Sequence, residues 1–202
     1  MICVEDFGAG SSVTKSSSRS VKNIAGSSLK SKKFAQLLYR MVTYFKPSVI
    51  VELGTSLGIT TSYIASGNTT AQVYTLEGSQ AISEIATNTF SQLKIGNIIL
   101  KEGAFEQTLP ELLSEIPQVD FAFVDGNHRR APTLAYLDKL LKVCNENSVI
   151  VFDDIHWSSE MEEAWLEIIS NDAVTLSIDL FVLGLVFFRK DFKAKQHFSI
   201  RF

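Results

Sequence analysis

The chain has few cysteines and no excess of positive charge, and each of these absences excludes a class of protein. Its two cysteines, Cys3 and Cys144, are too few and too far apart in sequence for a disulfide scaffold. We therefore expect two free thiols in a reducing compartment. Nineteen lysines and arginines stand against 22 aspartates and glutamates, which gives a net charge of −3. This balance argues against nucleic-acid binding through bulk positive charge.

The chain also lacks an apolar run long enough to cross a membrane, which takes about 18 residues. The longest apolar stretch, 178–188, is interrupted by Asp179 and Gly184. No basic segment followed by an apolar one opens the chain, so no signal peptide is expected. The length of 202 residues and the hydrophobic share of 46% suit one folded domain. We expect a cytoplasmic protein that binds neither membranes nor nucleic acid, and the sequence leaves a homodimer open.

The first part of the chain differs in composition from the rest. Residues 11–31 hold nine serines, and up to Lys33 there are six basic residues against Glu5 and Asp6. Such a segment buries little surface, so we expect a flexible, Ser-rich, basic arm over 1–28 and one folded domain over 29–202. The arm either binds a phosphate or an acidic partner or is a solvated linker, and its composition favours the linker.

From residue 29 onwards, short apolar strands alternate with helical stretches. Helices are expected over 34–45, 58–66, 79–93, 105–115, 131–145 and 159–170, and strands over 49–53, 72–76, 97–101, 119–124, 148–152, 174–180 and 185–189. Strands rich in Val, Ile and Phe without polar alternation indicate a parallel sheet that helices cover on both faces. The last two strands are separated by only four residues, so they must form an antiparallel hairpin.

The turn after the first of these strands predicts a ligand-binding site. Two glycines, Gly54 and Gly58, let the backbone turn tightly and approach a ligand closely before a helix begins. Glu52, at the end of the strand, can accept hydrogen bonds from an ammonium group. The alternative is a strand-to-helix turn that binds nothing. The candidate ligand-binding residues of this turn are Glu52, Gly54, Thr55, Ser56 and Gly58.

The ends of the next two strands indicate that the ligand is a nucleoside. Glu77 ends the second strand, where an acidic side chain can accept hydrogen bonds from both ribose hydroxyls. Gly103 and Ala104 follow the third strand in a turn whose backbone can meet an adenine ring. A nicotinamide cofactor would place its pyrophosphate at the first turn, where Glu52 would repel it. The ammonium group of S-adenosylmethionine fits that position better.

Residues 52–58, Glu-Leu-Gly-Thr-Ser-Leu-Gly, resemble the first motif of class I S-adenosylmethionine-dependent methyltransferases, and Glu77 matches their ribose-binding acid. The terminal hairpin is also the layout of that family, and the resemblance covers roughly residues 30–190. It implies an α/β, Rossmann-like, seven-stranded sheet in the order 3-2-1-4-5-7-6. Strand 7 would be antiparallel, helices would cover both faces, and the cofactor would lie over strands 1, 2 and 4.

Three aspartates follow the fourth and fifth predicted strands. Asp125 ends the fourth strand, and Asp153 and Asp154 follow the fifth. Neighbouring parallel strands would bring these carboxylates together, and they would repel one another unless a cation lies between them. Oxygen ligands of this kind suit Mg²⁺ or another divalent cation. The alternative is that the aspartates cap the helices that follow.

These aspartates are similar to the metal ligands of cation-dependent O-methyltransferases of the sugar or macrolide and catechol types. The second member of the pair is Asn in catechol enzymes, so Asp154 is closer to the sugar and macrolide type. Catechol enzymes also carry a lysine base at the position of His128, so that base is not carried over. In the mechanism that the resemblance implies, we expect Asp125 or His128 to take the proton of the acceptor hydroxyl, because histidine is a common general base. Asp125 is also expected to contact the cofactor.

The sequence therefore predicts a methyltransferase that moves a methyl group from S-adenosylmethionine to a hydroxyl of a small molecule with the help of a divalent cation. One alternative keeps the cofactor but not the metal, with His128 as the base. Another is a nucleoside-binding module without catalysis. His156 is expected near the acceptor, and Trp157 either joins it there or packs in the core. We expect Trp165 in the core and His197 in a solvated tail. Three phenylalanines are expected to pack on the sheet: Phe181, Phe187 and Phe188.

Overall fold

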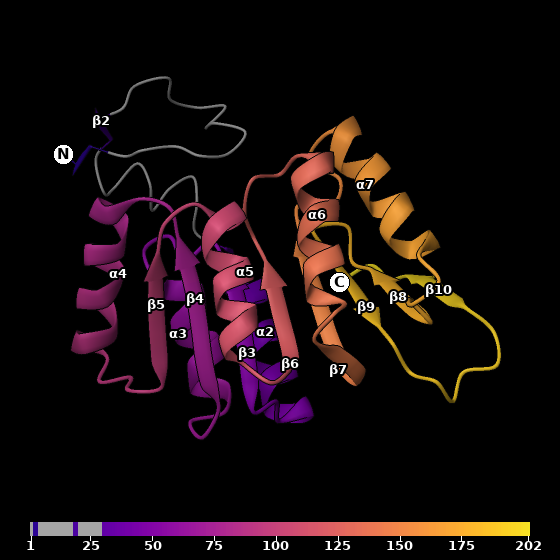
Figure 1. Cartoon of the computed structure of the whole chain (residues 1–202), viewed down its shortest axis with the longest axis horizontal. Coiled ribbons are helices and arrows are strands. Elements are labelled where there is room, and N and C mark those ends of the chain that lie inside the picture. Colours follow the sequence, from indigo (N-terminus) through magenta and orange to yellow (C-terminus); the bar gives the residue numbers. More distant parts are fainter. Residues whose placement is uncertain (1, 4–17, 20–29) are drawn as a thin grey trace. The chain divides into compact units, whose positions relative to one another are not determined.

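The computed structural model describes residues 2–3, 18–19 and 30–202 (Figure 1). The arm predicted over 1–28 lies outside these residues, apart from two short antiparallel strands, β1 (Ile2–Cys3) and β2 (Ser18–Arg19). Cys144 is a free thiol, as predicted, whereas the side chain of Cys3 is outside the described part. None of the helices in the described ranges is long and apolar enough to cross a membrane. The chain divides into two compact units, Met1–Thr108 and Leu109–Phe202.

The first unit is built on three parallel strands in the order β5-β4-β3. Its elements are α2 (Lys32–Phe45), β3 (Val49–Leu53), α3 (Ile59–Gly67), β4 (Gln72–Glu77), α4 (Gln80–Gln92) and β5 (Ile98–Glu102), and α5 (Phe105–Glu115) begins in it. Ile50, Val51 and Leu53 of β3 and Val73 and Leu76 of β4 are fully buried, which explains why these strands show little polar alternation. The strand order matches strands 3-2-1 of the predicted sheet.

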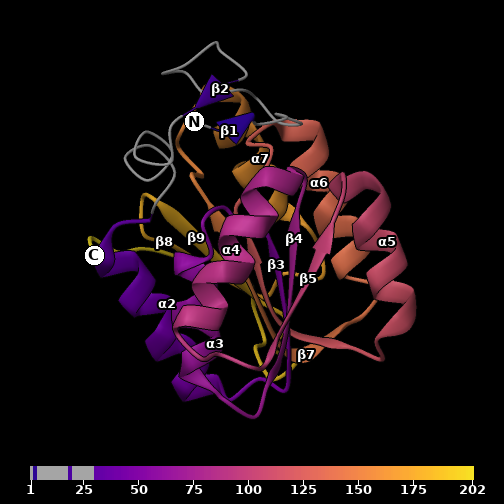
Figure 2. The same ribbon diagram turned by 90° about the vertical axis from the view of Figure 1, so that its left-hand side faces the viewer.

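Helix α2 shows how the sequence sets one helix of this unit. Its apolar residues bury one face, with Leu38 and Val42 at 0% exposure. The helix ends at Phe45 because Lys46 takes a left-handed conformation, with φ 49°. Helices α2 and α3 lie side by side (Figure 2), and a Cβ at Gly67 would lie 2.9 Å from the Val42 side chain. The close approach of the two helices therefore requires glycine at that position.

The second unit holds five strands in the order β6-β7-β9-β8-β10. Its elements are β6 (Val119–Val124), α6 (Arg130–Leu140), β7 (Cys144–Asp153), α7 (Ser159–Ser170), β8 (Leu176–Asp179), β9 (Leu183–Phe187) and β10 (Gln196–Ser199). Strands β6 and β7 are parallel, and β9 is antiparallel to both β7 and β8. The predicted order 4-5-7-6 and the terminal hairpin are thus confirmed, and with them the Rossmann-like α/β fold.

Three details of the second unit differ from the prediction. The helix predicted over 131–145 ends at Leu140, because the chain already enters β7 at Cys144. Gly184 lies inside β9 rather than in the hairpin turn, and a Cβ there would lie 2.6 Å from the Trp165 ring of α7. His197, predicted in a solvated tail, lies in β10, where its Nδ1 is 2.8 Å from Ser177 Oγ. Strand β10 is thus an eighth strand beyond the predicted seven.

Candidate functional site

The turn between β3 and α3 depends on backbone conformations that favour glycine. Gly54 and Gly58 have φ angles of 100° and 77°, and Ser56 between them has a φ of 48°. The N–H groups of Gly54 and Thr55 both donate to the carbonyl oxygen of Leu76, at 3.0 and 3.2 Å. These bonds hold the turn after β3 against the end of β4, so the ends of the two strands are fixed relative to each other.

Gly58 also has a packing role that the sequence motif did not indicate. A Cβ at this position would lie 2.6 Å from Cε1 of Phe90 and 3.2 Å from the Cα of Ala86, both in α4. Glycine therefore allows α4 to pack directly against the turn. The prediction that Gly58 gives a ligand close access to the backbone is separate from this contact and stays a prediction.

Glu77 is held in a fixed orientation at the end of β4. Its Oε2 accepts the N–H of Ser56 in the glycine turn at 2.9 Å, and its Oε1 accepts the N–H of Ser79 at 3.0 Å. Its own carbonyl oxygen accepts the N–H of Gly103, which has a φ of 136°. Three predicted cofactor residues, Ser56, Glu77 and Gly103, are therefore linked by hydrogen bonds, and Ala104 follows directly.

Glu52 is completely buried, in contrast to the half-buried Glu77. Its Oε2 accepts hydrogen bonds from the hydroxyls of Thr61 in α3 and Thr75 in β4, at 2.5 and 2.6 Å. Its Oε1 has no hydrogen-bond partner among the described residues. Burial raises the pKa of Glu52 to about 7; the two threonine bonds lower it, and the charge of Glu77 raises it further. The unused oxygen leaves one acceptor for a ligand.

In the second unit, three chemistry-bearing side chains come together. One ligand atom from each of Asp125, His128 and Asp153 lies within 4.8 Å of the others. Asp153, at the end of β7, is 1% exposed, whereas Asp125 and His128 are partly exposed. The imidazole Nε2 of His128 is 3.5 Å from Oδ1 of Asp125. Asp154, the third predicted metal ligand, is not a member of this group.

The loop after β6 explains why His128 lies beside Asp125. Asn127 and His128 have φ angles of 68° and 38°, so two consecutive residues take the left-handed conformation. The Asn127 side-chain amide donates to the Tyr136 hydroxyl of α6 at 3.3 Å. This turn brings His128 back towards the strand end. Asp154 also has a positive φ, 53°, where the chain leaves β7.

A second histidine takes part in a network that the sequence did not predict. His156 lies with Nε2 2.8 Å from Oδ2 of Asp179 and Nδ1 3.4 Å from Oε1 of Glu162. Its ring stacks on Phe181, with a centroid distance of 5.3 Å and an interplanar angle of 24°. Burial alone would raise the pKa of Asp179, but hydrogen bonds from His156 and from the N–H of Phe181 hold it below its usual range. Only the hairpin brings these positions together.

Two aromatic side chains near this network are exposed. Trp157 is 61% exposed, which excludes the interpretation that it packs in the core. Phe181 is 73% exposed, so the prediction that it packs on the sheet with Phe187 and Phe188 is wrong. It takes a φ of 72° in the tight turn between β8 and β9. Trp165 is 3% exposed and belongs to the core, as predicted.

Comparison with known proteins identifies the family. Residues 51–155, just over half of the chain, match a family model described as a methyltransferase domain. The chain belongs to this family. No curated protein sequence matches the chain. The predicted resemblance to methyltransferases is therefore confirmed at the level of the family.

Solved structures share the fold of this methyltransferase domain. An O-methyltransferase from Bacillus cereus in complex with SAH is 18% identical, with a TM-score of 0.70 over 83% of this chain and 90% of that one. The O-methyltransferase TomG from Streptomyces achromogenes, in complex with SAM, is 16% identical, with a TM-score of 0.69 over 84% and 89%. The SAH-bound methyltransferase PaMTH1 from Podospora anserina is 18% identical, with a TM-score of 0.70 over 80% of each chain.

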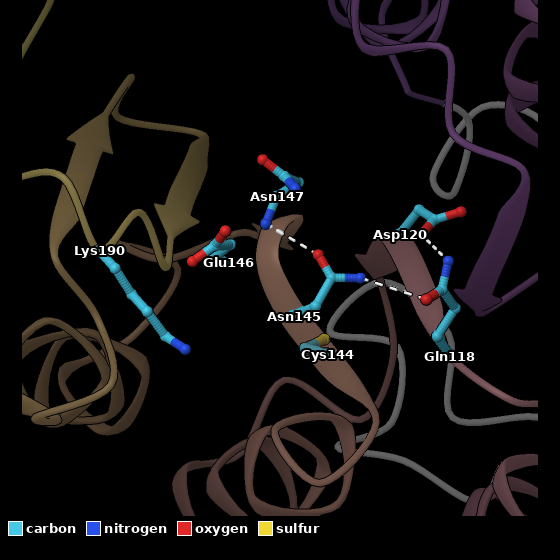
Figure 3. Close-up of a pocket in the computed structure, with 7 residues that line it drawn as sticks. All are labelled: Gln118, Asp120, Cys144, Asn145, Glu146, Asn147 and Lys190. Carbon is cyan, nitrogen blue, oxygen red and sulfur yellow. Dashed lines mark hydrogen bonds between the residues drawn. The ribbon is translucent and has the colours of Figure 1, made fainter.

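The second unit of this methyltransferase domain also has a polar pocket, which is distinct from the group formed by Asp125, His128 and Asp153. It is lined by Gln118, Asp120, Cys144, Asn145, Glu146, Asn147 and Lys190 (Figure 3). All of these residues except Lys190, which follows β9, lie where β6 and β7 begin, whereas Asp125 and Asp153 lie where those strands end. Its amide side chains bond to one another, with the Asn145 amide 3.4 Å from Oε1 of Gln118. The pocket therefore contains none of the predicted site residues.

Proposed function

We propose that this methyltransferase domain transfers the methyl group of S-adenosylmethionine to a hydroxyl group of a small molecule. A divalent cation assists the transfer and binds where Asp125 and Asp153 come together. The observation that carries the proposal is the glycine turn of the first unit, hydrogen-bonded to Glu77, in a chain that belongs to a methyltransferase family. The cofactors bound to the similar B. cereus and S. achromogenes enzymes support the choice of S-adenosylmethionine.

The residues of the first unit fit the two polar ends of this cofactor. Both oxygens of Glu77 accept backbone N–H groups, which orients the carboxylate, and carboxylate oxygens are the acceptors that ribose hydroxyls need. The unused Oε1 of Glu52 is an acceptor for the ammonium group of the methionine part. The proposed cofactor-binding residues are Glu52, Gly54, Thr55, Ser56, Gly58, Glu77, Gly103, Ala104 and Asp125.

The second unit supplies the residues for a cation and for proton transfer. Asp125 and Asp153 offer carboxylate oxygens, and the third ligand is either Asp154, as the sequence predicts, or His128, which the structure adds to the group. When bound, the cofactor supplies a sulfonium methyl group, and the cation lowers the pKa of the acceptor hydroxyl. Asp125 or His128 accepts the proton of that hydroxyl, since carboxylates and imidazoles act as general bases in enzymes.

A second candidate keeps the methyl transfer but not the cation. The 3.5 Å approach of His128 Nε2 to Asp125 Oδ1 resembles a base held by a carboxylate, which needs no metal. Activity that survives EDTA would favour this candidate. A nucleoside-binding module without catalysis predicts cofactor binding but no methyl transfer to any acceptor.

The proposal is tested by calorimetry followed by an activity screen. The full chain is titrated with S-adenosylhomocysteine and, in parallel, with NADH, and only the first is expected to bind. Release of S-adenosylhomocysteine from S-adenosylmethionine is then measured over a panel of phenols, sugars and hydroxylated macrolides, with MgCl₂, with MnCl₂ and with EDTA. Binding of NADH alone, or no turnover with any acceptor, contradicts the proposed enzyme.

A further inference from the structure

The donor atoms gathered at the end of β7 are not all oxygens. Asp125 and Asp153 offer carboxylate oxygens, and His128 offers an imidazole nitrogen, all within 4.8 Å of one another. Asp153 is 1% exposed, so its charge is removed from water. Two carboxylates this close, one of them buried, repel each other, and a cation between them removes the repulsion. The imidazole completes a three-sided set of ligand atoms.

The chemistry of this set bears on which cation it takes. Mg²⁺ and Ca²⁺ are bound almost entirely by oxygen, whereas imidazole suits Zn²⁺, Fe²⁺ and other first-row transition metals. The alternative oxygen-only set, Asp125 with Asp153 and Asp154, would suit Mg²⁺. The structure brings His128 rather than Asp154 into the group.

We propose that His128 is a metal ligand together with Asp125 and Asp153, and that the site therefore prefers a transition-metal dication such as Mn²⁺ or Co²⁺ to Mg²⁺. The inference rests on the cation of the proposed function but not on methyl transfer. An imidazole nitrogen that binds a metal cannot also accept a proton. The assignment thus excludes that nitrogen of His128 as the base and leaves Asp154 outside the ligand set.

The preference is measured by titrating the full chain with MnCl₂, CoCl₂ and MgCl₂ separately, without cofactor or acceptor. We expect Mn²⁺ and Co²⁺ to bind at least about 10-fold more tightly than Mg²⁺. The His128→Asp variant has an all-oxygen set of ligands, so the ratio of its Co²⁺ affinity to its Mg²⁺ affinity should be about 10-fold lower than in the native chain. Aspartate tolerates the left-handed backbone at position 128, so the variant keeps the loop. Equal affinities in the native chain, or an unchanged ratio in the variant, would overturn the assignment.

A spectroscopic measurement identifies the nitrogen directly. Pulsed EPR of the Mn²⁺-loaded chain should show coupling to one imidazole ¹⁴N, and His128→Asp and His128→Ala should both lose it. Asp154→Asn should change the Mn²⁺ affinity by less than about 3-fold, and a loss above about 100-fold, more than an outer-shell partner costs, would return Asp154 to the ligand set. S-adenosylhomocysteine titrations of each variant report whether it is folded. Because metal binding is measured without cofactor, its failure is distinct from a failure of methyl transfer.

Discussion

The two units use acidic residues at strand ends in different ways. In the first unit, Glu52 and Glu77 accept hydrogen bonds from nearby hydroxyls and backbone N–H groups, which fixes the glycine turn to β4. In the second unit, Asp125 and Asp153 converge on each other and on His128. A carboxylate that accepts hydrogen bonds from its own chain stabilises the local backbone. Carboxylates that lie close together repel one another and so favour the binding of a cation. Acidic residues at the ends of strands thus serve two purposes.

The largest effect is expected when one of the two neighbouring carboxylates, Asp125 and Asp153, is replaced. Asp153→Asn keeps the size of the side chain but removes the buried charge, so it should lower methyl transfer about 1,000-fold if a cation assists the reaction. Turnover is measured with the acceptor that the screen selects, at saturating S-adenosylmethionine. Asp172→Asn, which changes an exposed carboxylate after α7, is the matched control. Unchanged turnover in Asp153→Asn would favour the mechanism without metal.

A smaller effect on stability is expected at Glu52. Its pKa is raised from 4.5 in the unfolded chain to about 7, so the folded state holds the proton more tightly. The stability that this group contributes is complete below pH 4.5 and is lost as the pH rises to about 7, by roughly 3 kcal/mol. Glu52→Gln should remove this loss, as measured by urea unfolding between pH 5 and pH 8.

Glu111→Gln, an exposed change on α5, serves as the control for general charge effects. If the unfolding free energies of Glu52→Gln and of the native chain fall in parallel as the pH rises, the raised pKa of Glu52 is wrong. In that case Glu52 would be charged near neutral pH.

The contact between the glycine turn and α4 can be tested by adding a side chain at Gly58. Gly58→Ala introduces a Cβ 2.6 Å from the Phe90 ring at a backbone φ of 77°, and we expect it to destabilise the fold by about 2 kcal/mol. Gly96→Ala is the matched control, because a Cβ there meets nothing within 4 Å. Urea unfolding of both variants gives the difference. Equal stabilities would show that α4 does not pack against the turn.

The smallest effect concerns the cofactor. Glu77→Gln keeps the shape of the side chain but loses its charge, so S-adenosylhomocysteine should bind about 10-fold more weakly. Glu102→Gln, at the paired position of β5, should bind it as the native chain does. Calorimetry of both variants measures the ratio. Equal binding by Glu77→Gln would mean that Glu77 supports the turn without contacting the ribose.

The sequence predicted the first unit more completely than the second. The turn at Gly54 and Gly58 and the acid at Glu77 are local patterns, and the structure links them by short hydrogen bonds. In the second unit the sequence predicted a group of Asp125, Asp153 and Asp154. The structure has His128 in this group in place of Asp154. Which of two adjacent aspartates joins a group depends on the backbone as it leaves the strand, and no local pattern reports that.

The interactions that the sequence did not predict join residues far apart in the chain. His156 meets Asp179, 23 residues later, only because the terminal hairpin brings β8 beside β9. Phe181 is exposed because it lies in the turn between β8 and β9. These are results of strand register, which a run of apolar residues does not specify to the single residue.

The sequence by itself determined the alternation of strands and helices, the terminal hairpin and the glycine turn, because hydrophobic pattern and turn chemistry are local properties. The tertiary structure decided the surroundings of the ionisable side chains. It buried Glu52 and so raised its pKa, and it turned His128 towards Asp125 and Asp153. Burial and the approach of charges depend on which segments meet in space, and that is fixed only when the whole chain has folded.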